Sequence, residues 1–265
     1  MLNRRDLFNL TPLVLLPAVL RPVSKVLQAA SAPAVDTAFP SHPYALVKEM
    51  VGASHGNVAR VKEIVGRSPA MARAAVDWGY GDWEDALGAA SHVGNREIAE
   101  FLIANGARPS IFSAAMLGQL DAVKAFIAAM PGVEAIHGPH SITLLRHAMA
   151  GGAAAQPVVD FLKTLPGADR KPEAQPIGAE ELAALTGTYT FGPGPADQLL
   201  VAVTTQGILT IARPGAFPRN LTHVGDRAFY PSGATSARIK FTDANGALTV
   251  SVFDPDLIVA AAKAR

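Results

Sequence analysis

The sequence contains no cysteine, few aromatic residues and no excess of charge of either sign. Without cysteine there can be no disulfide framework, no thiolate-ligated metal and no thiol nucleophile. The 265 residues carry 23 basic and 22 acidic side chains, so the chain lacks the overall charge that would attract nucleic acid. Hydrophobic residues make up 49% of the sequence, which excludes wholesale disorder, and the length predicts about two domains.

A long apolar run is missing as well. The apolar stretch nearest the N-terminus, residues 10–20, has 11 residues, whereas a membrane-spanning helix needs about 20. Arg4 and Arg5 precede this stretch and small residues follow it at 28–34, a pattern typical of a signal peptide. The arginine pair resembles a twin-arginine export signal, which implies removal of residues 1–34 and a periplasmic location. The alternative is a disordered or amphipathic leader.

A helical pattern repeats four times between residues 44 and 168. The clearest copies are residues 87–94 and 111–118, which are rich in small residues and end in glycine. An amphipathic run follows each copy, with apolar residues at positions i, i+3 and i+4 on one helix face. The glycines of the four copies are Gly56, Gly94, Gly118 and Gly152, at spacings of 38, 24 and 34 residues.

This pattern resembles the ankyrin repeat, in which two helices joined at a glycine recur about every 33 residues. Residues 143–152 fit the ankyrin pattern Thr-Pro-Leu-His-x-Ala-Ala-x-x-Gly, with Leu144 replacing the proline and Arg146 the histidine. The unequal spacings indicate an insertion after Ser68 and a lost hairpin after Gly106. The resemblance implies a stack of about four repeats with a concave interaction surface, and it brings no catalytic residues.

Residues 169–179 predict a linker, and residues 180–265 predict a second domain made of strands. The linker contains two prolines and a glycine, Pro172, Pro176 and Gly178, which cannot sustain a helix or a central strand. Apolar and polar residues then alternate, and turn pairs such as Asn245-Gly246 separate the alternating runs. We expect about six to eight antiparallel strands in a meander or partial barrel. The predicted fold class is therefore α+β with two domains.

Three stretches of the second domain resemble the small β-domain that trails some bacterial serine hydrolases of the penicillin-recognising kind. These stretches are residues 185–189, the hairpin over 199–211, and Phe229-Tyr230-Pro231. In those enzymes the domain is an accessory that holds none of the chemistry, so the resemblance implies an accessory domain here.

Both tryptophans of the chain lie in one acidic, glycine-containing segment, residues 77–85. Aromatic residues on the loops of repeat proteins are typical binding anchors. The candidate partner-binding residues are Trp78, Tyr80, Asp82 and Trp83, together with His140 from a loop at 138–141. The alternative is structural, with the tryptophans capping the stack and Asp82 capping the helix that follows. The apolar helical spacing after Trp83 predicts that Trp83 is buried and Trp78 exposed.

Local sequence spacing predicts no metal or cofactor site. The seven histidines form neither a His-x-x-x-His nor a His-Glu-x-x-His helix motif. His55 and His92 occupy neighbouring positions at the ends of first helices, where we expect them to bond loop backbone. The loop at 138–141 is either a ligand loop or the turn that feeds the fourth repeat, with Ser141 or Thr143 as the helix N-cap.

These observations predict an exported, non-enzymatic repeat protein that binds an unidentified protein partner. One alternative is a small-molecule or envelope-component binder that uses a β-domain cavity lined by Tyr189, His223 and Tyr230. A second alternative is hydrolysis by Asp82, Glu84 and His140, which requires these side chains to lie within ~10 Å of one another.

Overall fold

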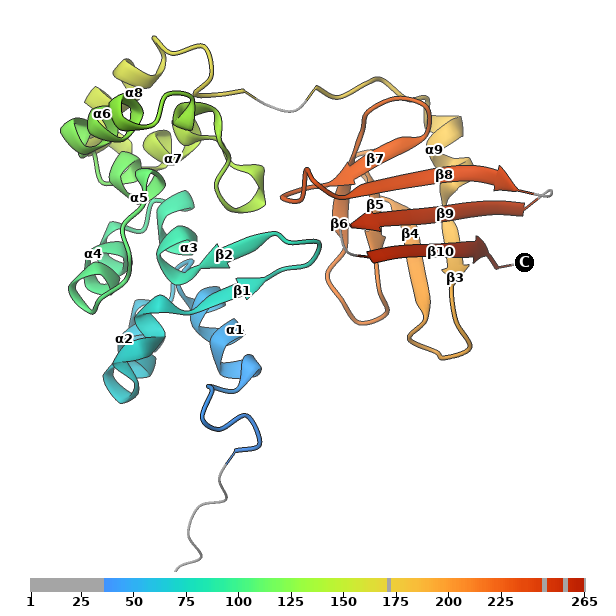
Figure 1. Cartoon of the computed structure of the whole chain (residues 1–265), viewed down its shortest axis with the longest axis horizontal. Coiled ribbons are helices and arrows are strands. Elements are labelled where there is room, and N and C mark those ends of the chain that lie inside the picture. Colours follow the sequence, from blue (N-terminus) through green and yellow to red (C-terminus); the bar gives the residue numbers. More distant parts are fainter. Residues whose placement is uncertain (1–35, 171–172, 245–246, 255–256, 265) are drawn as a thin grey trace, which may run out of the picture.

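The computed structural model describes residues 36–170, 173–244, 247–254 and 257–264. The chain folds into a helical half and a closed β-barrel, joined by an extended linker (Figure 1). This arrangement confirms the α+β class. The predicted signal peptide, residues 1–34, lies outside the described residues.

The helical half consists of four consecutive helix pairs, which lie where the repeated pattern predicts them. The pairs are α1 (Tyr44–Ala53) and α2 (Val58–Arg67), α3 (Ala86–His92) and α4 (Arg96–Ala104), α5 (Ile111–Met116) and α6 (Leu120–Ala129), and α7 (Leu144–Ala150) and α8 (Gln156–Leu162). Short 3₁₀ helices accompany them: η1 (Pro69–Arg73), η2 (Val133–Ala135), η3 (Pro139–Ser141) and η4 (Gly152–Ala155).

The first helices of successive pairs pack directly on one another, in the order α1, α3, α5 and α7. Small residues allow this close approach, since Ala90, Ala115 and Ala148 are completely buried between the helices. Gly94 and Gly118 both have positive φ, and a Cβ at either position would collide with backbone of the fourth pair, at Ala150 and Ala154 respectively. The glycine of the repeated pattern therefore serves both the turn and the packing.

A β-hairpin fills the insertion between α2 and α3. Its strands, β1 (Ala75–Asp77) and β2 (Trp83–Asp85), pair antiparallel, and Figure 1 shows the hairpin pointing at the barrel. Asp85, not Asp82, caps α3 by accepting a hydrogen bond from the Gly88 N–H at 2.5 Å. The predicted cap at Asp82 is wrong because residues 83–85 form a strand and α3 begins two residues later than expected.

The second half begins with the short helix α9 (Ala179–Leu185), and eight antiparallel strands follow. They are β3 (Gly187–Thr190), β4 (Gln198–Val203), β5 (Leu209–Ala212), β6 (Arg219–His223), β7 (Ala228–Pro231), β8 (Arg238–Ala244), β9 (Ala247–Asp254) and β10 (Leu257–Lys263). Sequential pairing, completed by the pairing of β10 with β3, closes the barrel. Closure removes the exposed edges that a partial barrel would leave.

The barrel core is aromatic at its centre, where Tyr189, Phe229 and Phe241 are fully buried. The Tyr189 hydroxyl donates a 2.7 Å hydrogen bond to the carbonyl of Leu185, which fixes α9 against the barrel. Ala234 is only 3% exposed because the loop after β7 folds back on itself. None of the helices in the described part of the chain is both long and apolar enough to cross a membrane.

Candidate metal centre

Four side chains converge between the helical half and the barrel: His55, Glu84, His92 and His140. His55 lies in the turn after α1, Glu84 lies in β2, His92 ends α3 and His140 lies in η3. One nitrogen or oxygen atom from each residue lies within 4.8 Å of all the others. The site therefore has the residue types and the proximity of a metal centre.

The distances within this cluster match a coordination sphere. Glu84 Oε1 lies 2.9 Å from His92 Nε2, 3.3 Å from His140 Nε2 and 3.6 Å from His55 Nε2. The Nε2 atoms of His55 and His92 are 3.1 Å apart. Four ligands held ~2.1 Å from a tetrahedral zinc ion would lie ~3.4 Å from one another, so the observed spacing suits an ion at their centre.

Outer hydrogen bonds orient the ligand atoms toward this centre. His55 Nδ1 lies 3.1 Å from the carbonyl of Gly52, and His140 Nδ1 lies 2.7 Å from Asp82 Oδ2. Both partners accept, so each Nδ1 donates and each Nε2 is turned toward Glu84, where a deprotonated Nε2 would offer its lone pair to a metal ion. Trp78 Nε1 donates to Glu84 Oε2 at 2.7 Å and leaves Oε1 for the centre. Such outer partners are characteristic of histidine and carboxylate metal ligands.

Asp82 joins this cluster to the barrel. Besides the ring of His140, it accepts the backbone N–H of His140 at 2.8 Å and a hydrogen bond from Arg219 of β6. These contacts hold His140 in the left-handed backbone region, at φ 58°, which is unusual for a residue other than glycine. A Cβ at Gly233 of the barrel would collide with the Asp82 carboxylate. The orientation of one candidate ligand thus depends on both halves of the molecule.

Hydrogen bonding shifts the pKa values of Glu84 and His140 in opposite directions. Burial alone would raise the pKa of Glu84, but hydrogen bonds with His140 and His92 outweigh burial and lower the pKa to about 2. Hydrogen bonds with Asp82 and Glu84 raise the pKa of His140 to about 9. The contacts of Asp82, Glu84 and His140 meet the distance condition set for hydrolysis. Neither pKa, however, suits a group that must exchange protons near pH 7.

Comparisons with protein-family models, curated proteins and solved structures find no significant match. What the cluster binds must therefore be inferred from its own donor atoms.

The predicted partner-binding residues divide among three environments. Asp82 and His140 belong to the candidate metal centre with Trp78 half-buried against it, Tyr80 packs at the barrel core, and Trp83 faces solvent. Trp83 is 65% exposed. The prediction that Trp83 is buried and Trp78 exposed is wrong. Residues 83–85 form a strand in which side chains alternate, so Glu84 points inward and Trp83 outward.

Sequence reasoning assigned His55 and His92 to backbone hydrogen bonding and did not group them with Glu84. Metal motifs are recognised by short spacing within one helix, whereas these two histidines are 37 residues apart. They end the first helices of adjacent pairs, and stacking brings equivalent positions side by side. The signal that could have revealed them is a histidine repeated at the same place in two successive units.

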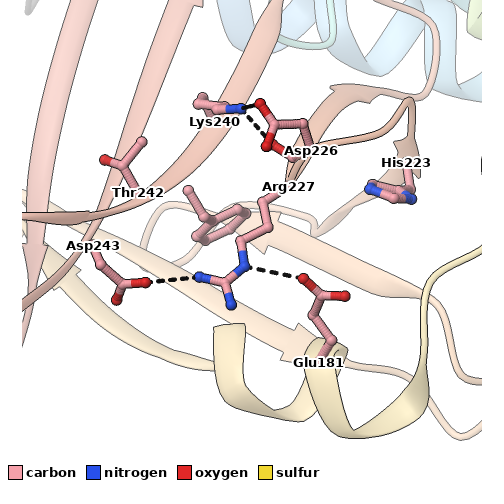
Figure 2. A pocket seen from close by; sticks show the side chains of 8 residues that line it. Glu181, His223, Asp226, Arg227, Lys240, Thr242 and Asp243 are labelled. Carbon is pink, nitrogen blue, oxygen red and sulfur yellow. Dashed lines mark hydrogen bonds and ion pairs between the residues drawn. The ribbon is translucent and has the colours of Figure 1, made fainter.

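A charged pocket of about 530 Å³, separate from the histidine cluster, lies on the barrel near α9 (Figure 2). Arg227 pairs with Glu181 at 3.0 Å and with Asp243 at 2.9 Å, and Lys240 pairs with Asp226. These ion pairs already neutralise both cations. His223, which was expected at the mouth of a ligand cavity, lies here instead, with Nδ1 3.1 Å from the carbonyl of Gln175. This pocket is therefore a weaker candidate site than the histidine cluster.

Proposed function

We propose that the protein binds one divalent transition-metal ion through His55, Glu84, His92 and His140. One observation carries this proposal: three imidazole Nε2 atoms converge on a single buried carboxylate oxygen. Without metal, protons on these nitrogens hydrogen-bond the carboxylate, and a metal ion would displace them and take the lone pairs of all three rings. A cation at the centre satisfies all of them together.

The donor set favours zinc among the common ions. Imidazole nitrogens suit Zn²⁺, Cu²⁺, Fe²⁺ and Ni²⁺, whereas Mg²⁺ and Ca²⁺ prefer sites made of oxygen atoms. Four protein ligands fill a tetrahedral coordination sphere, which is typical of zinc sites that hold a structure together. The proposed role is therefore to tie the hairpin and the loop at 138–141 to the stacked helices.

Metal titration of the purified, EDTA-treated chain tests this proposal. We expect one equivalent of Zn²⁺ to bind, and Co²⁺ in its place to give the visible absorption bands of a tetrahedral site. His55→Ala and Glu84→Gln should each abolish stoichiometric binding at micromolar metal. His42→Ala is the matched control, because His42 is exposed and bonds only Ser68 among the described residues. The proposal fails if the unmodified chain binds no ion, or if both ligand variants bind like the control.

We further propose that the four helix pairs are ankyrin-like repeats. The successive stacking of first helices, the buried alanines and the glycines at close approach support this assignment. A repeat stack suits the expected role of binding a protein partner, and the exposed ring of Trp83 supplies an aromatic anchor for such a partner. The accessory character of the barrel and the periplasmic location rest on the sequence resemblances alone.

A further inference from the structure

A cavity of about 460 Å³ lies where the β1–β2 hairpin meets the open end of the barrel. Leu199, Ile211 and Val252 form its inner wall, and they also belong to the barrel core. Trp78 and Tyr80 of the hairpin close its outer side. The volume falls in the range of small-molecule sites, and the walls are almost entirely apolar. The barrel is thus filled around Tyr189 but hollow beneath the hairpin.

The polar part of the wall has a single sign of charge. Arg213 and Arg219 border the cavity, and its lining in the described part of the chain includes no acidic residue. Arg219 is mostly buried, and its terminal nitrogen is held by Asp82 and the carbonyl of Ser232. Arg213 pairs with Asp197 at 3.8 Å, and its side chain is 53% exposed, so a ligand can still reach it. The two guanidinium groups favour an anionic group in this cavity, since none of its described lining residues is acidic.

We propose that this cavity binds a small amphiphile with an apolar body and a carboxylate head. The apolar body would lie against Leu199, Ile211 and Val252, and the carboxylate would accept from Arg213, with the positive charge of Arg219 nearby. The site differs from the cavity expected from sequence, because neither Tyr189, His223 nor Tyr230 lines it. The proposal does not depend on the metal ion. The two sites nevertheless share Trp78, whose Nε1 bonds Glu84 while its ring borders the cavity.

The fluorescence of Trp78, which lines the cavity, can report ligand binding. The chain has two tryptophans, so Trp83→Phe leaves Trp78 as the single fluorophore. Dodecanoate below its micellar concentration should change Trp78 emission saturably, with one molecule bound per chain. Dodecanol, which has the same chain without the charge, should bind at least tenfold more weakly. Titrations are made in EDTA and again with Zn²⁺, so binding in EDTA supports this proposal even if the metal centre proves wrong.

Adjacent residues on β10 give a matched pair of cavity variants. Val259 is half-buried and lines the cavity, so Val259→Phe should fill it and weaken dodecanoate binding at least tenfold. Ile258 is 72% exposed, so Ile258→Phe should bind like the parent chain. Absence of saturable binding, or equal binding by the two variants, would overturn the site. Equal affinity for dodecanoate and dodecanol would overturn the assignment of the carboxylate head.

Discussion

Glu84 carries a carboxylate at a position that is only 1% exposed, so its surroundings must stabilise the charge. Three histidines and the Trp78 indole do so on the two oxygens. Asp82, 2% exposed, is stabilised in the same way by His140 and Arg219. The two buried carboxylates are two residues apart and share His140, which contacts Asp82 through Nδ1 and Glu84 through Nε2, so all three belong to one buried polar network.

Asp82→Asn should weaken Zn²⁺ binding 10- to 100-fold without unfolding the chain. The amide can still accept the backbone N–H of His140, but it no longer provides the negative charge that supports the imidazole as a metal ligand. Competition with a coloured chelator measures the affinity. Asp77→Asn is the control, since the Asp77 carboxylate accepts a 2.8 Å hydrogen bond from the Gly79 N–H within the same hairpin. Equal affinities in the two variants would contradict the outer-ligand role.

His147 makes the metal-free fold sensitive to acid. It is fully buried, and burial lowers its pKa to about 4, whereas an unfolded histidine titrates near 6.5. Between these values the unfolded chain binds more protons, so stability falls as the pH drops from 6.5 toward 4. We expect a loss of about 2–3 kcal/mol by pH 4.5, measured by urea unfolding in EDTA. His147→Gln should flatten this slope, and an unchanged slope would rule His147 out as its cause.

The β1–β2 hairpin is the element that most clearly determines the site. Its alternation directs Glu84 toward the histidines and Trp83 toward solvent, and its turn carries Tyr80 to the barrel. Three successive residues of that turn, at 79–81, have positive φ. Two of them are glycines, which adopt this conformation without steric strain. A short strand pair thus positions residues for the metal centre and the cavity together.

Fluorescence of single-tryptophan variants should separate the two rings. Trp78→Phe leaves Trp83, whose emission we expect to be red-shifted and readily quenched by acrylamide. Trp83→Phe leaves Trp78, whose emission should be blue-shifted and protected by its half-buried position. Trp83→Ala should change the free energy of unfolding by less than about 0.5 kcal/mol, as for an exposed side chain. A loss of 3–5 kcal/mol would instead indicate a buried ring.

Close packing of the first helices gives a second test at this scale. Ala115→Leu places a larger side chain at a completely buried position of α5 and should destabilise the fold by about 1–3 kcal/mol through overpacking. Ala125→Leu, on an exposed face of α6, is the control and should cost little. Thermal or urea unfolding measures the difference. Equal effects at both positions would contradict the observed stacking.

Periodicity predicted most elements because it reports which face of an element is buried. It predicted four helix pairs between residues 44 and 168 and a series of antiparallel strands in the second half, and the structure contains both. It missed β10, where the alanines at 260–262 provide little alternation. It also misread residues 83–85, since three residues are too few to distinguish a strand from the start of a helix. The histidine cluster escaped it because tertiary stacking, not local spacing, creates that site.

At the scale of the whole molecule, the two halves meet through polar contacts around the candidate metal centre. Arg219 reaches Asp82, and the N–H of Gly233 donates to the Ser141 hydroxyl at 3.1 Å. Tyr80 adds an apolar contact with the barrel core. The linker alone would leave the halves independent, so these contacts fix the relative position of the metal centre and the cavity.

Export is a property of the complete chain and can be tested separately. Replacing Arg4 and Arg5 by lysine should leave the precursor in the cytoplasm, because a twin-arginine receptor reads the guanidinium pair. Cell fractionation and immunoblotting measure the distribution, with Lys25→Arg as a control that keeps the charge and leaves the pair intact. Unchanged export of the double variant would indicate a general secretory signal instead.

The spread of the four candidate ligands along the chain has a thermodynamic consequence. His55 and His140 are 85 positions apart, so one ion bound to both closes a long loop in a chain that has no cysteine. Such a closure acts as a reversible cross-link, whose strength is set by free metal concentration instead of redox potential. At a thousandfold excess over the dissociation constant, mass action adds about 4 kcal/mol to the folded state. The free energy of unfolding would then rise and fall with the concentration of free metal ion around the protein.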